Sequence, residues 1–301
     1  MMLAVTGGTG FVGGRLLHLA AGTPHRIKAL TRRPQEARPR VEWIQGSLED
    51  RDALQQLVDG ADAVIHIAGV VNAADAAGFE RGNVAGTLAL LAASTAAGVQ
   101  RFVHVSSLAA REPDLSLYGA SKARGERLVA ESGLDWVIVR PPAVYGPGDR
   151  ELLELFKAAS LGLIPLPPSG RLSLIHADDL GRLLLALAEP GTPSRVIFEP
   201  DDGHPSGYTH RAFAQAIGSA LERNPVLLPL PATLLKAGAR IDQLIRRGNA
   251  KLTVDRVAYF CHPDWVSDPH KRPPSELWVP QISAERGLGE TAEWYCEQGW
   301  L

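Results

Sequence analysis

Cysteine is scarce in this sequence, which has only Cys261 and Cys296 among its 301 residues. The two lie far apart in the chain, so neither the short-spaced pairs of a zinc site nor a disulfide framework is present. We therefore expect two free thiols in a reducing compartment and no bound metal.

Long apolar runs are absent as well. The longest, such as residues 183–188, fall well short of the ~20 residues that a bilayer-spanning helix needs. The chain opens with a strand-like run, Met1 to Thr6, which is too short for a signal sequence and follows no basic segment. These absences predict a cytoplasmic protein without a membrane partner.

A strong charge of either sign is also missing, because the formal net charge is −2. Such a balance gives no electrostatic reason to expect nucleic acid or an anionic membrane as a partner. The composition, 45% hydrophobic and 21% charged, is ordinary for a globular protein. The length allows one large domain or a domain with an appendage.

Strand-like and helix-like segments alternate through the first half of the chain. Apolar runs predict strands at residues 2–6, 26–30, 41–44, 63–67, 101–106 and 136–140. Helical patterns between them cover residues 13–21, 50–58, 79–97 and 118–132. Such alternation implies a parallel sheet with helices on both faces. We therefore predict an α/β fold with a doubly wound parallel sheet.

The sequence pattern changes in the second half of the chain. After about Pro141 prolines cluster, and strand-like and helix-like segments no longer alternate. Helical patterns remain at residues 151–161, 179–188, 211–221 and 232–246, with scattered strands such as Arg195–Phe198. We expect one domain over residues 1–148 and a smaller, mostly helical substrate lobe over residues 149–301. A later part of the chain has room to return to the sheet.

Three glycines, Gly7, Gly10 and Gly13, lie between the first predicted strand and the first predicted helix. The first permits a tight turn, the second lets the backbone approach a pyrophosphate, and the third lets the helix pack close to the sheet. The helix N-terminus then offers N–H groups to the phosphates. The pattern predicts a dinucleotide site of the Rossmann type within residues 1–148.

The residues after the second predicted strand bear on the choice between NAD and NADP. An NAD site usually carries an acidic residue there, which binds the ribose 2′-hydroxyl. This chain has Thr31 followed by Arg32 and Arg33, and guanidinium groups can pair with a 2′-phosphate. We therefore expect NADP, with NAD as the open alternative.

Tyr118 and Lys122 are four residues apart, so both side chains share one face of a predicted helix. A free tyrosine has a pKa of ~10 and is a poor acid near neutrality. A neighbouring ammonium favours the phenolate, and lowering the pKa by three units takes ~4 kcal/mol. The pair predicts proton exchange with a carbonyl or alcohol.

A series of motifs in this order resembles the extended or atypical short-chain dehydrogenase/reductase superfamily. The motifs are residues 6–13, 66–69, 83–87, 105–107, 118–122 and 140–147. This superfamily includes sugar-nucleotide epimerases, dihydroflavonol-type reductases and 3β-hydroxysteroid dehydrogenases. The resemblance covers about residues 1–179.

The resemblance implies an NAD(P)-dependent oxidoreductase that moves hydride between NADP(H) and a carbonyl or alcohol substrate. It makes Tyr118 the acid–base residue, Ser107 the group that polarises the substrate oxygen, and Lys122 a ribose ligand. Ser106 neighbours Ser107, and either could lie nearest to the substrate. The implied cofactor contacts are Gly7, Thr9, Gly10, Phe11, Val12, Gly13, Arg32, Arg33, Ser47, Leu48, Ala68, Gly69, Tyr118, Lys122, Pro141 and Val144.

The sequence departs from the family pattern at two places, which count against a nucleotide-sugar substrate and against one expected adenine contact. Only eleven positions separate Ser107 from Tyr118, where the sugar epimerases usually carry a longer insert. Ser47 stands where a family aspartate commonly binds adenine. The alternatives are a nucleotide-sugar epimerase or dehydratase that retains NAD, and a non-catalytic NAD(P)-binding scaffold or redox sensor.

Further residues receive structural interpretations. We expect His66 to be a core or cofactor-lining imidazole and Asp178 to cap a helix. Family relatives often form homodimers through two helices, here residues 79–97 and 118–132. The small residues Ala89, Ala92, Ala93 and Ala96 allow close helix approach, although they could equally serve the core.

Overall fold

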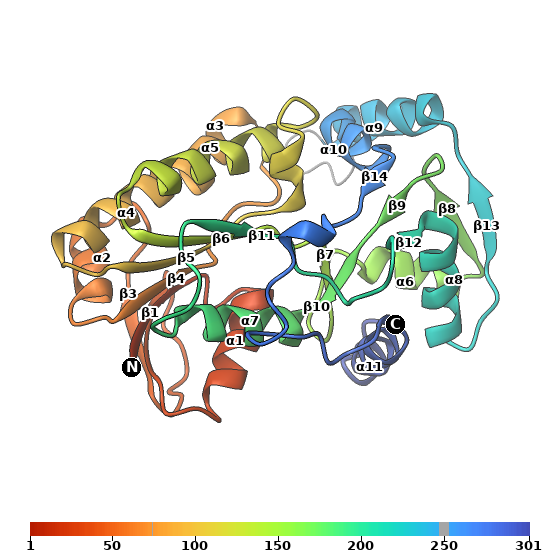
Figure 1. Cartoon of the computed structure of the whole chain (residues 1–301). Helices are drawn as coiled ribbons and strands as arrows, with labels where there is room; N and C mark the ends of the chain where they lie inside the picture. Colours follow the sequence, from red (N-terminus) through yellow and green to blue (C-terminus); the bar gives the residue numbers. More distant parts are fainter. Residues whose placement is uncertain (74, 247–252) are drawn as a thin grey trace. The chain divides into compact units, whose positions relative to one another are not determined.

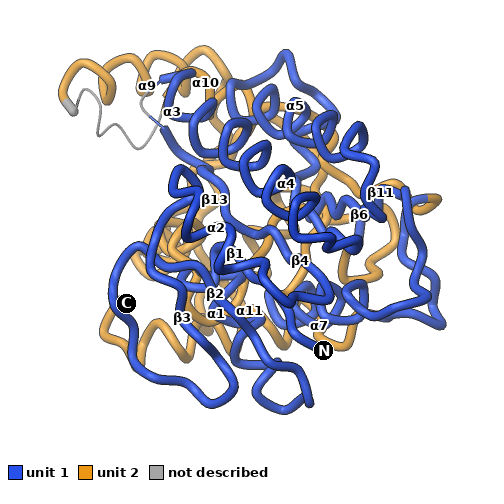
Figure 2. The backbone as a smooth tube through the Cα atoms, turned by 90° about the vertical axis from the view of Figure 1, so that its left-hand side faces the viewer, with its two compact units in different colours: residues 1–141, 177–200, 271–279 blue, residues 142–176, 201–270, 280–301 orange. Residues whose placement is uncertain are grey.

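The computed structural model describes residues 1–73, 75–246 and 253–301. Within them the chain forms two compact units (Figure 2). Unit 1 comprises residues 1–141, 177–200 and 271–279, and unit 2 comprises residues 142–176, 201–270 and 280–301. The expected single boundary at residue 148 stays a prediction.

Unit 1 contains a seven-stranded parallel sheet with the order β11-β6-β5-β4-β1-β2-β3 (Figure 1). From the centre, the strand order runs β1-β2-β3 toward one edge and β4-β5-β6 toward the other, which is the topology of a doubly wound sheet. The predicted Rossmann-type fold is confirmed. The strands are β1 Met2–Thr6, β2 Arg26–Thr31, β3 Val41–Gln45, β4 Ala63–His66, β5 Arg101–Val105, β6 Asp135–Val139 and β11 Val196–Phe198.

Helices cover both faces of this sheet (Figure 1). On one face α1 (Phe11–Ala20) packs against α7 (Ala177–Ala188). A Cβ on Gly181 would lie 2.8 Å from Leu19 Cδ1, so the glycine allows this close approach. The other face carries α2 (Arg51–Val58), α4 (Gly86–Ala96) and α5 (Leu117–Glu131).

A cluster of buried apolar side chains fills much of the space between the sheet and the second group of helices. Leu54, Leu57, Leu90, Phe102 and Ile138 are all at most 1% exposed. Burying each such side chain stabilises the fold by about 1.5–3 kcal/mol relative to leaving it in water. Asp50 caps the N-terminus of α2, because its carboxylate accepts a hydrogen bond from the Ala53 N–H at 3.1 Å.

The helix predicted over residues 79–97 begins earlier and is interrupted. It consists of α3 (Ala76–Phe79), a π-helical segment over Glu80–Ala85, and α4. Such a wide turn displaces side chains from α-helical register and is frequent at functional sites. It contains Asn83.

Unit 2 combines helices with three small sheets. Its core contains Tyr145, Phe156, Ile217, Leu288 and Tyr295. The sheets pair β7 (Ala143–Tyr145) with β10 (Leu174–His176), β8 (Leu163–Leu166) with β13 (Val226–Pro229), and β9 (Arg171–Leu172) with β12 (Tyr208–Thr209) and β14 (Asp264–Trp265). The helices are α6 (Leu153–Ser160), α8 (His210–Ala220), α9 (Ala232–Arg246), α10 (Val254–Phe260) and α11 (Ala284–Glu297).

One predicted strand has a different partner from the one expected. The sequence analysis places Arg195–Phe198 in the lobe but leaves room for a later segment to return to the sheet; β11 is such a segment, since it pairs with β6 of unit 1. A three-residue apolar strand carries no signal of which sheet it joins. Separately, no helix among the described residues is both long and apolar enough to cross a membrane.

Candidate functional site

The glycine-rich turn leaves the start of α1 open to a phosphate. Gly7 has a φ of +77°, and a Cβ there would lie 2.6 Å from the Ala68 N atom. A Cβ on Gly13 would lie 2.1 Å from the Gly7 carbonyl oxygen. Gly10 caps α1 without any side-chain hydrogen bond, so the helix N–H groups remain available to an anion.

The predicted residues of this turn differ in exposure. Thr9 and Gly10 are exposed, Phe11 and Val12 are partly buried, and Gly13 is buried. The exposed pair is thus placed to meet phosphate oxygens, while Gly13 serves the packing of α1 against the turn.

A hollow of about 560 Å³ lies beyond the ends of β2 and β3. Arg32, Gln45, Gly46, Ser47 and Asp50 line it. The Ser47 hydroxyl accepts a bond from the Glu49 N–H at 3.2 Å. Its own proton can therefore still be donated to a ligand.

The two arginines of the sequence prediction are not equivalent. Both are exposed, but only Arg32 lines the hollow. The backbone of Arg33 is hydrogen-bonded to the Thr31 hydroxyl, which accepts from the Arg33 N–H and donates to the Arg33 carbonyl oxygen. Asp50, which was not singled out from the sequence, also lines the hollow, and its carboxylate accepts a bond from the Ala53 N–H at 3.1 Å.

Lys122 is 5% exposed and its ammonium donates to the Val105 carbonyl oxygen at 3.0 Å. Burial lowers the pKa of Lys122 to about 8, while the charge of Glu126 acts in the opposite direction. The backbone of Gly69 comes close, because a Cβ there would lie 3.0 Å from Lys122 Nζ. One hydrogen bond thus fixes an ammonium that has three donors, close to the backbone of Gly69.

Tyr118 lies in the first turn of α5 and is partly exposed. Ser116 caps that turn by accepting a bond from the Gly119 N–H at 2.9 Å. Gly119 packs against the turn after β5, since a Cβ there would lie 2.6 Å from the Ala109 carbonyl oxygen. The Phe79 ring lies 6.2 Å from the Tyr118 ring.

The two serines after β5 have different environments. Ser106 donates to Glu126 Oε1 at 2.5 Å, and Glu126 also binds Arg140. Ser107 accepts a bond from the Ala109 N–H at 3.2 Å and retains its hydroxyl proton for donation. This difference favours Ser107 as the residue that faces a substrate.

His66 is held between two hydroxyl groups and is fully buried. Its Nδ1 lies 2.6 Å from Thr6 Oγ1 and its Nε2 lies 2.9 Å from Thr87 Oγ1. Thr87 donates its only proton to the Asn83 carbonyl oxygen, so Nε2 must be the protonated nitrogen. Desolvation, followed by the charge of Lys122, lowers the pKa of His66 to about 3.

Asn83 continues this chain of polar contacts. Its amide accepts from the Val70 N–H at 2.6 Å and donates to Ser121 Oγ at 2.9 Å. Ser121 in turn donates to the Tyr118 carbonyl oxygen at 2.7 Å. Asn83 thus ties the backbone at Val70 to Ser121 of α5. The contacts of Thr6, Thr87 and Ser121 were not predicted from the sequence.

The remaining predicted cofactor residues fall in both units. Leu48 packs against Gly86, and the Pro141 carbonyl accepts a bond from the Leu108 N–H at 3.1 Å. Ala68 donates its N–H to Thr6 Oγ1 at 3.2 Å. Val144 lies on β7 of unit 2.

The expectation that Asp178 caps a helix is wrong. Helix α7 begins at Ala177, and Asp178 instead accepts two hydrogen bonds of 2.6 Å from Arg15 on α1. Within the described residues, no three His, Cys, Asp or Glu side chains are grouped as metal ligands.

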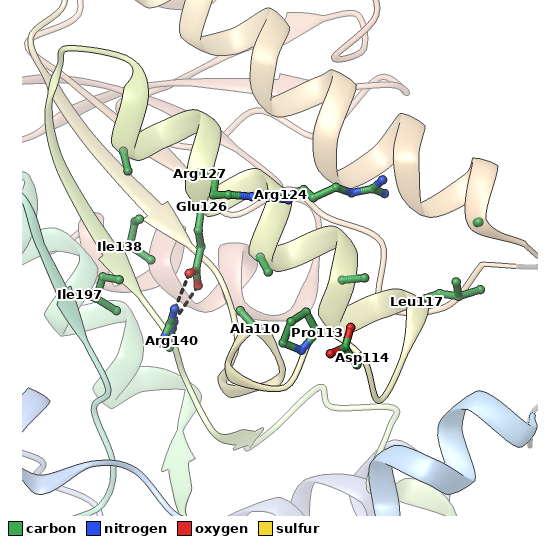
Figure 3. Close-up of a pocket in the computed structure, with 14 residues that line it drawn as sticks. Ala110, Pro113, Asp114, Leu117, Arg124, Glu126, Arg127, Ile138, Arg140 and Ile197 are labelled. Atoms are coloured by element: carbon green, nitrogen blue, oxygen red, sulfur yellow. Dashed lines mark hydrogen bonds and ion pairs between the residues drawn. The ribbon is translucent and has the colours of Figure 1, made fainter.

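A second hollow, of about 700 Å³, lies along α5 beside Ile138 of β6 and Ile197 of β11 (Figure 3). Leu117, Ala120, Arg124 and Arg127 line it, and Tyr118 and Lys122 do not. Figure 3 shows the Glu126–Arg140 pair at its inner wall. It is therefore distinct from the face of α5 that carries the predicted catalytic pair.

Comparison with known proteins identifies the family. The model of the NAD dependent epimerase/dehydratase family matches residues 3–197. The chain belongs to this family. Its membership in the extended short-chain dehydrogenase/reductase superfamily and its nature as an enzyme are thereby confirmed.

Two relatives with named activities are similar to this chain. Ceramide reductase of Caulobacter vibrioides is 37% identical over 309 residues, covering 100% of this chain and 96% of the relative. A 4-hydroxy-2-methyl-3-oxo-4-farnesyl-3,4-dihydroquinoline-1-oxide ketoreductase of Stigmatella aurantiaca is 33% identical, covering 67% of this chain and 68% of the relative. Both names describe reductases, which supports oxidoreduction.

A solved structure of MoeE5 in complex with UDP-glucose and NAD is similar with a TM-score of 0.75. It is 22% identical, with 99% of each chain covered. At this identity the likeness shows the fold alone.

Proposed function

We propose that this enzyme reduces a carbonyl group of an apolar, lipid-like substrate with NADPH, or oxidises the corresponding alcohol. The observation that carries the proposal is the buried ammonium of Lys122, one helical turn from Tyr118 on α5. A fixed positive charge beside a phenol stabilises the phenolate that remains after proton donation.

The roles of the side chains follow from their donors and acceptors. Ser107 donates a hydrogen bond to the substrate oxygen and so draws charge onto it. Tyr118 gives its proton to that oxygen as it becomes a hydroxyl. Lys122 stabilises the resulting phenolate and binds the nicotinamide ribose with its remaining N–H groups. When bound, NADPH supplies the hydride.

The cofactor fits the open start of α1, where Gly10 leaves N–H groups for the pyrophosphate. We propose that Arg32 binds the 2′-phosphate of NADP, since it lines the hollow beside Ser47. Arg33 then contributes charge from outside the hollow.

The relatives favour an apolar substrate. Ceramide and a farnesylated dihydroquinoline both carry long hydrocarbon chains, and the relatives named for them are reductases. The alignment with ceramide reductase extends over the whole chain, including the substrate lobe. We therefore propose a long-chain ketone in a ceramide-like lipid as the substrate class.

An assay of purified protein with NADPH tests this function. We expect NADPH consumption and an alcohol product by mass spectrometry with detergent-dispersed long-chain 3-oxo lipids, and much slower turnover of short water-soluble ketones. Failure to form an alcohol from any of these lipids, with NADPH binding intact, would refute the proposed reaction.

A second candidate is an epimerase or dehydratase that retains NAD. The presence of Asp50 in the lining of the hollow beside Arg32 favours it, since acidic groups bind the 2′-hydroxyl of NAD. Release of NAD, and not NADP, from heat-denatured purified protein would support this candidate over the first.

We also propose a cytoplasmic homodimer. Cys261 and Cys296 are free thiols, which suits a reducing compartment. Ala92 and Ala96 on α4 are exposed, whereas Ala89 and Ala93 pack against the core, so only part of the small-residue face is available to a partner. Light scattering of the purified chain tests the dimer.

A further inference from the structure

Exposed apolar side chains are concentrated in one stretch of unit 2. Among the described residues, 13 large hydrophobic side chains are exposed. Four belong to the single helix α9, and four more belong to the β8–β13 ribbon and its preceding turn. These eight are Leu234, Ile241, Leu244 and Ile245, and Leu161, Leu163, Val226 and Leu228. Strand β13 leads directly into α9, so both groups adjoin along the chain.

Three of the exposed apolar residues of α9 lie on one face of the helix. Leu234, Ile241 and Ile245 are separated by seven and four residues, a spacing that aligns side chains. They are 58%, 56% and 76% exposed. Ala239, on the other side of the helix, is fully buried and packs α9 onto its unit. The apolar face of α9 is thus turned toward solvent.

The segment that contains α9 is cationic, although the whole chain is not. Residues 232–260 contain six lysines and arginines but only two aspartates, while the chain as a whole has a net charge of −2. Lys236 and Arg240 are also exposed on α9, on its polar side away from the line of Leu234, Ile241 and Ile245. A cationic helix with an exposed apolar face is the signature of a helix that lies in a membrane interface.

The length of α9 excludes a spanning arrangement. Its 15 residues extend ~22 Å, less than the ~30 Å of a bilayer core. An in-plane position would bury Leu234, Ile241 and Ile245 among acyl chains. Long basic side chains reach the headgroup region from such a position.

We propose that α9 binds the enzyme reversibly to the surface of an anionic bilayer. The sequence analysis predicted no membrane partner from the net charge and from the absence of long apolar runs. Both features describe the chain as a whole and not this segment. Anionic headgroups complement Lys236 and Arg240, and the acyl region takes the apolar face. This inference goes beyond the proposed reaction, because binding requires neither cofactor nor turnover.

Vesicle sedimentation of the full chain tests the inference. Phosphatidylcholine vesicles with and without phosphatidylglycerol are compared, with no NADPH present. We expect binding about ten-fold or more stronger to the anionic vesicles, falling steeply with added salt. Absence of binding to either vesicle would overturn the inference, whatever the outcome of the reductase assay.

Three variants assign the binding surface. Ile241→Ser with Ile245→Ser removes apolar contact, and Lys236→Glu with Arg240→Glu reverses charge; each should weaken vesicle binding about ten-fold or more. The matched control, Leu88→Ser with Val279→Ser, alters exposed apolar residues of unit 1 and should leave binding unchanged.

Circular dichroism melting and light scattering accompany each variant. Unchanged vesicle binding by both folded α9 variants would overturn the assignment. So would conversion of a wild-type dimer to a monomer by the Ile241/Ile245 variant, because the face would then join two copies of this chain.

Discussion

The ammonium of Lys122 is fixed on the carbonyl oxygen of Val105 at 3.0 Å, so α5 is tied to the end of β5. Ser106 and Ser107 follow Val105 directly, and Tyr118 lies one turn before Lys122. This hydrogen bond therefore connects the segment that contains Ser106 and Ser107 with the helix that carries Tyr118, the predicted proton donor.

The low pKa of Lys122 is directly measurable. We expect its 13C-labelled side chain to titrate near pH 8 in NMR spectra, because burial disfavours the charged form. Glu126→Gln should lower that pKa further, since the Glu126 charge supports the ammonium. Glu131→Gln, an exposed change on the same helix, is the control. Titration near the ordinary value of 10.5 would show that Lys122 is solvated.

Carbonyl reduction should lose rate above about pH 8, as Lys122 loses its proton. The phenolate of Tyr118 then lacks a neighbouring positive charge. Initial rates at saturating NADPH across the pH range provide the measurement. A flat profile through pH 10 would separate Lys122 from the acid–base step.

Substitution of the two serines should give opposite signatures. Ser107→Ala removes the proposed donor to the substrate oxygen and should lower kcat about 10²–10³-fold with little change in stability. Ser106→Ala removes a bond to buried Glu126 and should chiefly lower the melting temperature, through a loss of about 1–3 kcal/mol. Rate assays and thermal melts on both variants separate the roles. A reversed pattern would assign the substrate contact to Ser106.

Cofactor preference should depend on Arg32 more than on Arg33. Arg32→Glu is expected to weaken NADP binding far more than NAD binding, because only the former carries a phosphate for this side chain. Arg33→Glu serves as the matched change outside the hollow. Titration of both nucleotides by fluorescence gives the affinities. Equal losses for NAD and NADP in Arg32→Glu would remove the assignment.

Acid should destabilise the fold partly through His66. Its folded pKa of about 3 lies below the ordinary 6.5, so the unfolded chain binds more protons between these values. Stability is present above pH 6.5 and falls by about 1.4 kcal/mol per pH unit below it for this one histidine. The free energy of unfolding, measured with urea at pH 7, 6 and 5, should fall less steeply with decreasing pH in His66→Gln than in the wild type. The same pH dependence of the unfolding free energy in the variant and the wild type would contradict a neutral buried His66.

The sheet and the main helices of unit 1 were predictable because their signals are local. The predicted strand over residues 2–6 matches β1, and alternating apolar runs define its neighbours to within a residue or two. Residues 232–246 are also helical, as their spacing predicts. The short strand β11 was assigned to the lobe because three residues do not specify a partner.

The contacts that organise the candidate site come from distant parts of the chain. Thr6, His66 and Thr87 meet only once β1, β4 and α4 are packed together, so no spacing in the sequence indicates their hydrogen bonds. Similarly, Arg15 draws Asp178 into an ion pair across two helices in place of a cap. The roles of Ser107, Tyr118 and Lys122 remain predictions.

The most direct test is the rate of NADPH oxidation by Tyr118→Phe with a long-chain 3-oxo lipid, beside the affinity of the variant for NADPH. General acid catalysis by the phenol predicts a loss of about 10²–10⁴-fold in rate, with NADPH affinity and the melting temperature unchanged. A variant that retains the wild-type rate would contradict a reaction in which Tyr118 supplies the proton.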